Sequence, residues 1–285
     1  MVENETWQNN RTVEQIVDDM DLFDDDLMSM VFDGNIPTTE LLLRIILRRD
    51  DIKIISVVGQ REFQNAVADG RNIRLDIFAI DSMGKHYNCE VQNRLKGAHV
   101  RRARFHSSMI DSRMLKAGQE FSEIQDSYMV FITRTDVFGY GIPIYTVNRH
   151  FEEINAPFDD GSHIVYVNGS YRGEDAIGKL LHDFGCKESK DMYYQELANG
   201  VRHFKEEGGR RIMCEAVENY AKDYAEKYAK DYAEKYAKDY AERKRIDALY
   251  ETVKNLMETM KLSAEQAMSA MKVSDKDRGI LLKRL

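Results

Sequence analysis

Hydrophobic and polar positions along the first 170 residues predict a mixed α/β sheet with helical cover. Apolar residues recur at helical spacing in residues 22–32, 40–48 and 99–115, and Thr38 or Thr39 is placed to cap the second of these helices. Short β-branched or continuous apolar runs predict strands at 52–58, 73–80, 86–92, 128–133, 142–147 and 163–167. The order of helix, three strands, helix and strand is typical of an α/β core.

The next part of the sequence predicts helices. Residues 171–210 look helical but irregular, and we expect them to pack on the core formed by residues 1–170. Residues 211–245 carry a near-perfect repeat, YAKDYAEK, whose alanines and Asp–Lys pairs four residues apart favour one long helix. Its tyrosines recur every four residues, which exceeds one helical turn by about 40°, so they wind around the helix. No coiled-coil heptad is kept.

Two interpretations of this repeat helix follow. It is either an extended, solvated and loosely self-associating helix, or a surface whose tyrosines stack on nucleic-acid bases. The second interpretation calls for a strong basic bias, which the repeat lacks. We therefore favour the first, in which the helix is either solvated or loosely self-associating, so that a homo-oligomer is a candidate partner state.

Residues 246–285 read as a small helical C-terminal module. The stretch Ile246–Met260 is amphipathic, and Ser263 and Ser274 each precede a short helical pattern. Two short helices joined by a turn also suggest a helix-turn-helix. The second of them, DKDRGILLKRL, offers little polar surface for reading bases, which favours a packing module.

Composition excludes several classes of protein. Of the 285 residues, 43% are hydrophobic by a broad count, which is enough for a sizeable core. No run of about 18 apolar residues exists, which argues against a membrane-spanning helix, and the N-terminus lacks the pattern of a signal peptide, so we expect a cytoplasmic protein. Cys89, Cys186 and Cys214 are odd in number and widely spaced. They fit neither a disulfide framework nor a zinc site, and agree with a reducing compartment.

The charge is distributed unevenly along the chain. A formal net charge of −8 argues against a nucleic-acid partner, but the charge is concentrated locally, as in residues 18–26 (DDMDLFDDD), which hold several acids and no base. Residues 94–116 hold the single acid Asp111 among many bases. Those bases are Arg94, Lys96, Arg101, Arg102, Arg104, Arg113 and Lys116. Because local charge decides how one face meets a polyanion, DNA is a candidate partner.

The hairpin predicted at residues 73–92 carries two acids and an amide. Asp76 stands among apolar residues of the first strand, where an acid brings no benefit, and Glu90 and Gln92 share one face of the return strand. A three-residue loop at Ser82–Gly84, with its glycine in the left-handed position, puts Asp76 opposite Glu90. A two- or four-residue loop shifts the pairing by one and sends the acids to opposite faces.

Directly opposed carboxylates repel each other unless something neutralises them. A divalent cation held by oxygen ligands is the simplest answer, and Mg²⁺ typically takes one or two carboxylates together with waters and phosphate oxygens. Such a cation can bind a phosphodiester and acidify a water. The alternative is that Asp76 or Glu90 is an edge-strand charge paired with a lysine.

Longer segments around this hairpin resemble one family. RLDIFAIDSMGKHYNCEVQ, RRARFHSSMIDSRMLKAG and YMVFITRTDVFGYGIPIYTV are together similar to the recombination-promoting nuclease and transposase family of the PD-(D/E)XK superfamily, and the similarity extends over roughly residues 20–210. The resemblance implies a restriction-endonuclease-like α/β core, with a mixed central sheet flanked by helices. It also implies Mg²⁺-dependent DNA cleavage in transposition or recombination, for which Mn²⁺ can substitute.

The resemblance assigns roles to particular residues. Asp76 and Glu90 correspond to the family's metal ligands, and a carboxylate on the N-terminal helix often completes the site. Glu40 is the best match for that carboxylate, and Asp24–Asp26 is the other candidate. The superfamily's lysine is replaced by Gln92, which can hydrogen-bond but brings no cation.

Basic residues near the hairpin are candidates for the missing charge and for DNA contacts. Arg94 or Lys96, just past the strand, is placed to replace the charge of the lysine. The helix predicted at 99–115 resembles the family's R-x-x-[YF] helix through Arg102 and Phe105. Its arginines at 101, 102 and 104 could clamp DNA phosphates, or could form a solvated basic face instead.

Three functions are therefore in competition. The first is a metal-dependent DNA endonuclease with Asp76 and Glu90 holding Mg²⁺ and Gln92 in the usual lysine position. The second is a DNA-binding relic of the same fold, in which Gln92 marks lost chemistry. The third is an oligomeric interaction protein that acts through residues 211–285.

Overall fold

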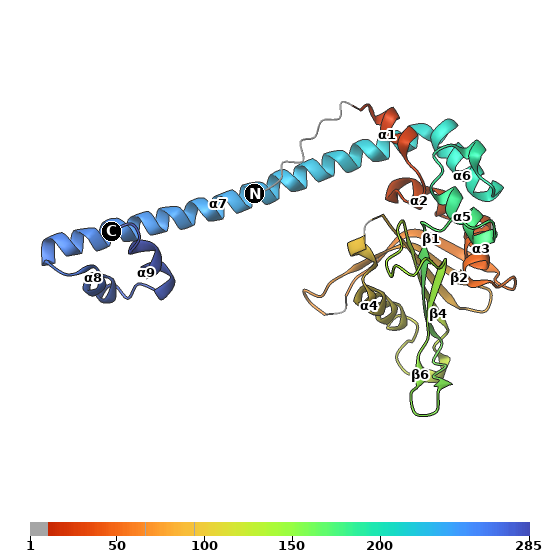
Figure 1. Ribbon diagram of the computed structural model, residues 1–285, viewed down its shortest axis with the longest axis horizontal. Coiled ribbons are helices and arrows are strands. Elements are labelled where there is room, and N and C mark those ends of the chain that lie inside the picture. Colours follow the sequence, from red (N-terminus) through yellow and green to blue (C-terminus); the bar gives the residue numbers. More distant parts are fainter. Residues whose placement is uncertain (1–10, 66, 94) are drawn as a thin grey trace. The chain divides into compact units, whose positions relative to one another are not determined.

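The computed structural model describes residues 11–65, 67–93 and 95–285, apart from the side chains of residues 95 and 96 (Figure 1). In this part of the chain a six-stranded sheet has the order β1-β2-β3-β4-β8-β5. Its strands are β1 (Ile54–Phe63), β2 (Ile73–Asp81), β3 (His86–Gln92), β4 (Ser127–Thr133), β5 (Ile144–Val147) and β8 (Ser162–Asn168). The pairs β3–β4 and β4–β8 are parallel and the others antiparallel, and β6 (His150–Phe151) pairs with β7 (Ala156–Pro157) in a small separate ribbon. This mixed sheet confirms the predicted fold class.

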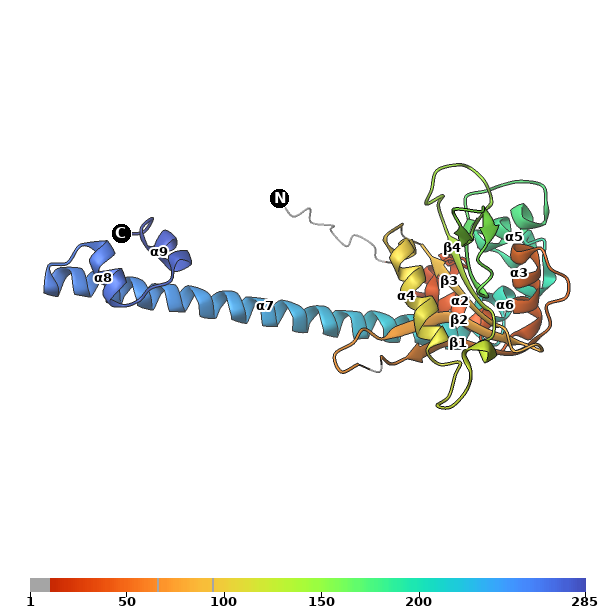
Figure 2. The same cartoon turned by 90° about the horizontal axis from the view of Figure 1, so that it is seen from below.

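Helices cover both faces of the sheet (Figures 1 and 2). The helices of this unit are α1 (Val13–Asp19), α2 (Asp25–Phe32), α3 (Ile36–Leu47), α4 (Val100–Asp111), α5 (Ala176–Phe184) and α6 (Gln195–Glu206). α4 covers one face, where Ala103 and Ile110 pack with Phe131 of β4. α2, α3, α5 and α6 cover the other face, so the sheet lies between two apolar layers.

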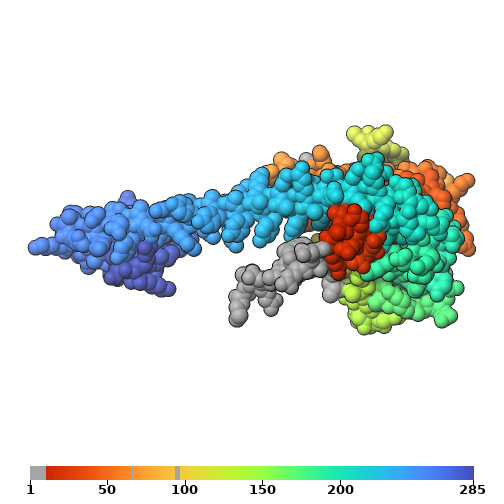
Figure 3. Space-filling model, turned by 90° about the horizontal axis from the view of Figure 1, so that it is seen from above, coloured from red at the N-terminus to blue at the C-terminus, as the bar shows by residue number. Residues whose placement is uncertain are grey.

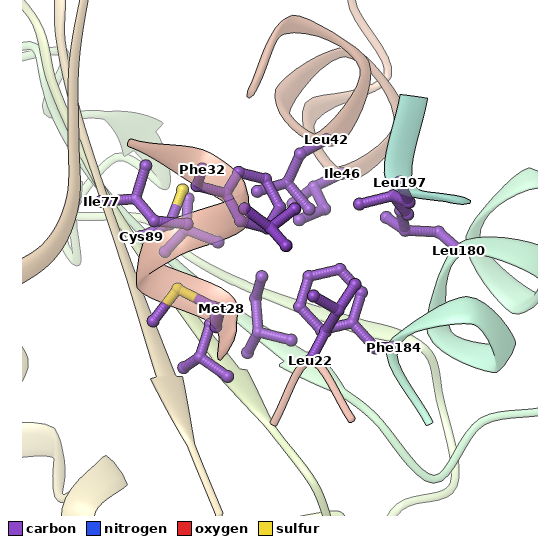
Figure 4. Packing of buried hydrophobic residues seen from close by; sticks show 14 of the residues in the cluster. Leu22, Met28, Phe32, Leu42, Ile46, Ile77, Cys89, Leu180, Phe184 and Leu197 are labelled. Carbon is purple, nitrogen blue, oxygen red and sulfur yellow. The ribbon is translucent and has the colours of Figure 1, made fainter. Parts of the chain in front are cut away.

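The larger core lies between the sheet and the helices α2, α3, α5 and α6. Figure 4 shows Leu22, Phe32 and Phe184 packed together between the strands and the helices. The rings of Phe32 and Phe184 lie 6.2 Å apart, and all three side chains are fully buried. Because α5 and α6 contribute to the same core as α2 and α3, residues 171–210 are an integral layer of this unit.

The helix α3 begins earlier than its sequence suggested. Asn35 is the cap residue, its Oδ1 accepts a hydrogen bond from the amide of Thr38, and a proline occupies the first turn. Thr38 and Thr39 are buried inside the helix, so the prediction that one of them caps it is wrong. Thr38 instead donates from Oγ1 to the carbonyl of Glu196 at 3.2 Å, which ties α3 to α6.

A buried lysine fastens the N-terminal segment to α6. Lys205 Nζ donates to the carbonyls of Asp18, Met20 and Lys187 at 2.6–2.8 Å. Arg210 forms an ion pair with Asp18 at 2.7 Å. Figure 3 shows this contact between the red N-terminal segment and the teal segment that follows α6.

The chain forms two compact units, Met1–Glu218 and Asn219–Leu285. The helix α7 (Arg210–Met260) begins in the first unit, where Met213 and Val217 are buried in the core, and continues into the second. The domain boundaries predicted at residues 170 and 210 stay predictions. The burial of Met213 and Val217 nevertheless places apolar side chains of the long helix in the first unit's core.

The second unit contains the repeat and a small helical module. The six tyrosines of the repeat are exposed, as expected for a stripe that winds around a helix. Beyond it, α8 (Ala264–Ala270) and α9 (Asp275–Leu281) pack with the end of α7 around Val253 and Met268. Ser263 and Ser274 cap these two helices as predicted. None of the helices in the described residues has the apolar length needed to cross a bilayer.

Candidate active site

The β2–β3 hairpin has the three-residue turn that aligns its two acids. Gly84 adopts a φ of +83°, and the amide of Asp81 donates to the carbonyl of Lys85 at 3.1 Å. The paired residues run from Ile80–His86 to Ile77–Cys89, and Asp76 and Glu90 are the next residues of the two strands in that register. The alternative registers, which would have sent the acids to opposite faces, are therefore excluded.

Asp76 lies where β2 separates from β3. The hydrogen-bonded ladder between the strands ends at Ile77–Cys89, and the Asp76 carboxylate accepts the amide of Val91 through Oδ2 at 2.9 Å. A side-chain oxygen thus takes the place of a strand carbonyl. On the other side of β2, the two neighbours of Gln60 in β1 pair with Ile77 and Leu75, which places Gln60 beside Asp76. Gln60 itself has a left-handed φ of 49°. The irregular backbone therefore holds Asp76 almost entirely buried, with 7% of it exposed.

Glu90 is fully buried and surrounded by donors. Asn88, two residues earlier on the same face of β3, donates to Oε1 at 2.9 Å. Arg102 of α4 donates to Oε2 at 2.8 Å, and His106 Nδ1 lies 3.4 Å from Oε1. The Nε of Arg102 in turn donates to His106 Nε2 at 3.3 Å, so one face of α4 is directed at Glu90.

The two acids differ in their preferred charge. Burial raises the pKa of Asp76 to about 8, and the negative charges of Glu90 and Asp25 add to this effect. Burial also acts to raise the pKa of Glu90, but His106, Asn88 and Arg102 outweigh it and hold that pKa below its usual value. The opposite directions of the two pKa shifts favour a pair that shares one proton, held mainly by Asp76, with the negative charge mainly on Glu90.

Gln92 meets the same arginine. Its side chain is half-buried, and Oε1 lies 3.5 Å from Nη1 of Arg102. Gly97 allows this close approach, because a Cβ built there would overlap Gln92 Oε1. A guanidinium thus lies beside the amide that replaces the family's lysine. The sequence contained one signal for this contact, since Arg102 and His106 are four residues apart and share a helix face.

The structure does not bring Glu40 to this pair. Glu40 accepts the amide of Ile54 at 2.9 Å and forms an ion pair with Arg44 at 2.6 Å. Ile54 pairs with Asp81 at the turn end of β2, five residues from Asp76, which corresponds to about 16 Å along a strand. The expectation that Glu40 joins the site therefore fails, because α3 meets the beginning of β1 and not its middle.

Asp24–Asp26, the other candidate for the N-terminal carboxylate, is better placed than Glu40 to act on the pair. The helix α2 packs on β1 and β2, and the charge of Asp25 in its first turn acts on the carboxyl of Asp76. Asp25 also forms an ion pair with Arg74 at 3.2 Å. Asp24 is held by the amide of Asp21, and burial raises the pKa of Asp26. Of the N-terminal acids, Asp25 therefore bears most directly on the pair.

The basic residues predicted to contact DNA differ in their exposure and in their contacts. Arg94 and the side chain of Lys96 lie outside the described residues. Arg101 and Arg104 are exposed on α4, and neither forms an ion pair with any residue in the described ranges. Arg102, by contrast, is half-buried and committed to Glu90. The helix thus separates one arginine in the site from two that face solvent.

The oxygen ligands at Asp76 and Glu90 fit a magnesium site. Each carboxylate oxygen has two lone pairs, so the oxygens that accept hydrogen bonds from Val91, Asn88 and Arg102 keep coordinating capacity. In the described ranges, no third His, Cys, Asp or Glu brings a ligand atom close to both acids. A cation here would therefore have two carboxylates and complete its shell with water or substrate oxygens, which is the mode Mg²⁺ prefers. The raised pKa of Asp76 indicates that ionising both carboxyl groups is unfavourable unless a further positive charge is bound beside them.

One comparison with known proteins gave a match, to a protein-family model. Residues 34–167 match the model of the PD-(D/E)XK nuclease family transposases, a range that includes α3, the whole sheet up to Val167, and α4. Neither the curated proteins nor the solved structures gave a match.

Proposed function

Because residues 34–167 belong to the PD-(D/E)XK nuclease family of transposases, we propose that the chain is a Mg²⁺-dependent DNA endonuclease that acts in transposition or recombination. The observation that carries the proposal is the buried pair Asp76–Glu90, which lies where the ladder between β2 and β3 ends and whose carboxylates have no lysine partner among the described residues. Mg²⁺ bound there, or Mn²⁺ in its place, would neutralise charge on a scissile phosphodiester and acidify a water.

The protein's own residues would have distinct tasks. Asp76 and Glu90 hold the cation, and Asp76 must give up its proton to do so. Gln92 is placed to hydrogen-bond the attacking water through its amide. Arg102 lies within 3.5 Å of Gln92 and would supply the positive charge that the missing lysine gives to other family members. This assignment replaces Arg94 and Lys96 as the source of that charge and leaves them as candidate phosphate contacts.

The exposed arginines would position the DNA. Arg101 and Arg104 project from α4, the helix that also directs Arg102 at Glu90. Contacts of their guanidinium groups with phosphates would fix the duplex beside the hairpin without reading its sequence. Binding would then be strongly salt-dependent, because each neutralised phosphate releases a counterion.

Cleavage of a supercoiled plasmid by the purified chain tests the proposal. We expect nicking or cutting with Mg²⁺ or Mn²⁺, none in EDTA, and binding without efficient cleavage in Ca²⁺, whose looser coordination activates water poorly. Asp76→Asn and Glu90→Gln should each abolish cleavage. Asp69→Asn, the same chemical change on an exposed loop, should leave it unchanged. Cleavage that persists in EDTA or in Asp76→Asn would overturn the assignment.

A second function is favoured by one specific contact. Both oxygens of Glu90 already accept hydrogen bonds from protein donors, Asn88 and Arg102, which is also what a DNA-binding relic with a disused site would show. In that case DNA binding would be intact and cleavage absent with every metal. Arg102→Lys distinguishes the two functions further, because a shorter cation should alter the rate of an active enzyme and leave the DNA affinity of a relic unchanged.

A further inference from the structure

His106 of α4 is a buried histidine whose two ring nitrogens meet different groups. The residue is 4% exposed, and its ring lies beside that of Phe131, with the centroids 6.5 Å apart. Its Nε2 accepts a hydrogen bond from Nε of Arg102 at 3.3 Å. Its Nδ1 lies 3.4 Å from Oε1 of Glu90 and forms no hydrogen bond with any described residue. The imidazole thus lies between the arginine and a buried acid of the candidate metal site.

Arg102 determines which ring nitrogen of His106 carries the proton. A guanidinium N–H donates and never accepts, and arginine stays protonated in proteins, so Nε2 must offer it a lone pair. A neutral imidazole has one proton, which is then on Nδ1, whereas an imidazolium would direct a second N–H at the arginine. The partner of Nε2 thus selects the neutral Nδ1–H tautomer and places the proton on the nitrogen that lies 3.4 Å from Glu90.

The Nδ1–H group of His106 calls for an acceptor. A buried donor without a partner costs about 1–3 kcal/mol, so pairing it would stabilise the folded protein. The separation of 3.4 Å from Oε1 of Glu90 is slightly more than the roughly 2.7–3.2 Å of an N–H···O hydrogen bond. A small rotation of the carboxylate toward the ring would therefore form this hydrogen bond.

Glu90 already has a donor on each of its oxygens. Asn88 donates to Oε1 at 2.9 Å from the same strand, and Arg102 donates to Oε2 at 2.8 Å from α4. A hydrogen bond from His106 would add a second donor from the helix and fix the plane of the carboxylate. Outer contacts of this kind hold a metal-ligating carboxylate in the orientation that the ion requires.

We propose that His106 is a positioning residue for Glu90. Arg102 holds its imidazole as the Nδ1–H tautomer, and Nδ1 donates to Oε1 of Glu90, so that the carboxylate has one orientation when it ligates a cation. The inference rests on the proposed function, because that function makes Glu90 a metal ligand. It also gives Arg102 a second task, since the arginine sets the tautomer of the histidine besides contacting Glu90 itself.

Nuclear magnetic resonance of the metal-free full chain, labelled with ¹⁵N in its histidines, tests the tautomer. Protonated and unprotonated ring nitrogens have well-separated chemical shifts, and the signals of His106 are those that disappear in His106→Asn. We expect a neutral ring with the proton on Nδ1. Addition of Mg²⁺ should shift these signals and leave those of His150, an exposed histidine of β6, unchanged. A proton on Nε2, or on both nitrogens, would overturn the assignment.

Two substitutions at His106 separate the donor from the acceptor. Asparagine can place an N–H near the position of Nδ1, whereas the amide of glutamine reaches the position of Nε2. His106→Gln should therefore weaken Mn²⁺ binding by about 10- to 100-fold, and His106→Asn by less than about threefold. The electron paramagnetic resonance signal of free Mn²⁺ measures both affinities. His150→Gln is the matched control and should bind Mn²⁺ as the wild type does.

The outcomes distinguish a positioning role from a packing role and from failure of the proposed function. If His106 only fills space, both variants should lose stability in thermal unfolding, and their Mn²⁺ affinities should be alike, which would overturn the proposal. A wild type that binds no Mn²⁺ would overturn the proposed function, and the positioning role with it. Should His106→Gln fail to fold, as judged by circular dichroism, the response of the His106 signals to Mg²⁺ decides.

Discussion

Replacing Asp76 with asparagine should make the metal-free protein more stable at neutral pH, although the proposed function expects the same change to abolish metal binding. Asparagine keeps the size of the side chain and an oxygen that can accept the amide of Val91. It removes a carboxyl group that is 7% exposed and lies beside the charge of Glu90. On folding, the variant therefore does not have to take up a proton at this position, and it keeps its hydrogen bond.

The magnitude follows from the pKa of Asp76, which burial and the charge of Glu90 raise from 3.8 to about 8. When the pKa of a group is higher in the folded state than in the unfolded state, the group makes its full contribution to the free energy of unfolding below the unfolded-state pKa. This contribution is lost as the pH rises through the folded-state pKa. Between pH 5 and 7 the wild type should therefore lose up to about 1.4 kcal/mol per pH unit from this group, and Asp76→Asn should not. The variant should gain about 3 kcal/mol relative to wild type over this range.

Differential scanning calorimetry in EDTA at pH 5, 6 and 7 measures this difference. A gain of about 3 kcal/mol corresponds to a relative rise in Tm of roughly 6–12 °C for a unit of this size. Asp69→Asn, on an exposed loop in a backbone conformation that asparagine adopts readily, should show no such trend. A stability difference between Asp76→Asn and wild type that does not grow with pH would refute the reasoning, because Asp76 would then be ionised already at pH 5.

Four further outcomes are expected. Glu90→Gln should destabilise the same protein by about 2–5 kcal/mol, since it leaves the buried partners of that carboxylate uncompensated, and calorimetry would detect this. Gln92→Lys should preserve or raise the cleavage rate, whereas Gln92→Ala should lower it by about five- to tenfold, the equivalent of one neutral hydrogen bond. Arg101→Glu and Arg104→Glu should weaken binding to all DNA sequences alike and reduce the salt slope by about 1 each in a titration by fluorescence anisotropy. A fragment ending at Glu218 should fold, and one ending at residue 209 should be less stable by several kcal/mol in urea, because it lacks two apolar side chains of the core.

The strands and the hairpin register could be predicted because local chemistry determines them. The turn residues Ser82–Gly84 include a glycine for the left-handed position, and this one position fixes every pairing along β2 and β3. The alternation of Glu90 and Gln92 on one face follows directly from the strand period. These features depend on residues within a few positions of one another, where a sequence pattern carries its strongest information.

Longer-range features could not be predicted in the same way. Glu40 was a reasonable metal ligand by sequence, but its position depends on where α3 meets β1, which no local pattern encodes. The strand β1 extends to Phe63, five residues beyond its apolar run, because β2 supplies a partner along the whole length. The packing of α5 and α6 into the core likewise depends on contacts with α2 and α3 that are more than 100 residues away along the chain.

Two pairs of helical side chains show the same limit of sequence patterns. Arg102 and His106 are four residues apart on α4, and His182 and Cys186 are four residues apart at the end of α5. This spacing establishes that two side chains share a helix face, but it does not indicate what that face meets. The first pair meets the buried Glu90 of β3, with which Arg102 forms a charge-neutralising contact. The second lies beside the buried Asp183 of its own helix, whose oxygens accept two backbone amides at the start of α6. In each case a buried carboxylate determines the surroundings of the pair, so the informative signal is an acid at an apolar position, such as Asp76 or Asp183, rather than the spacing itself.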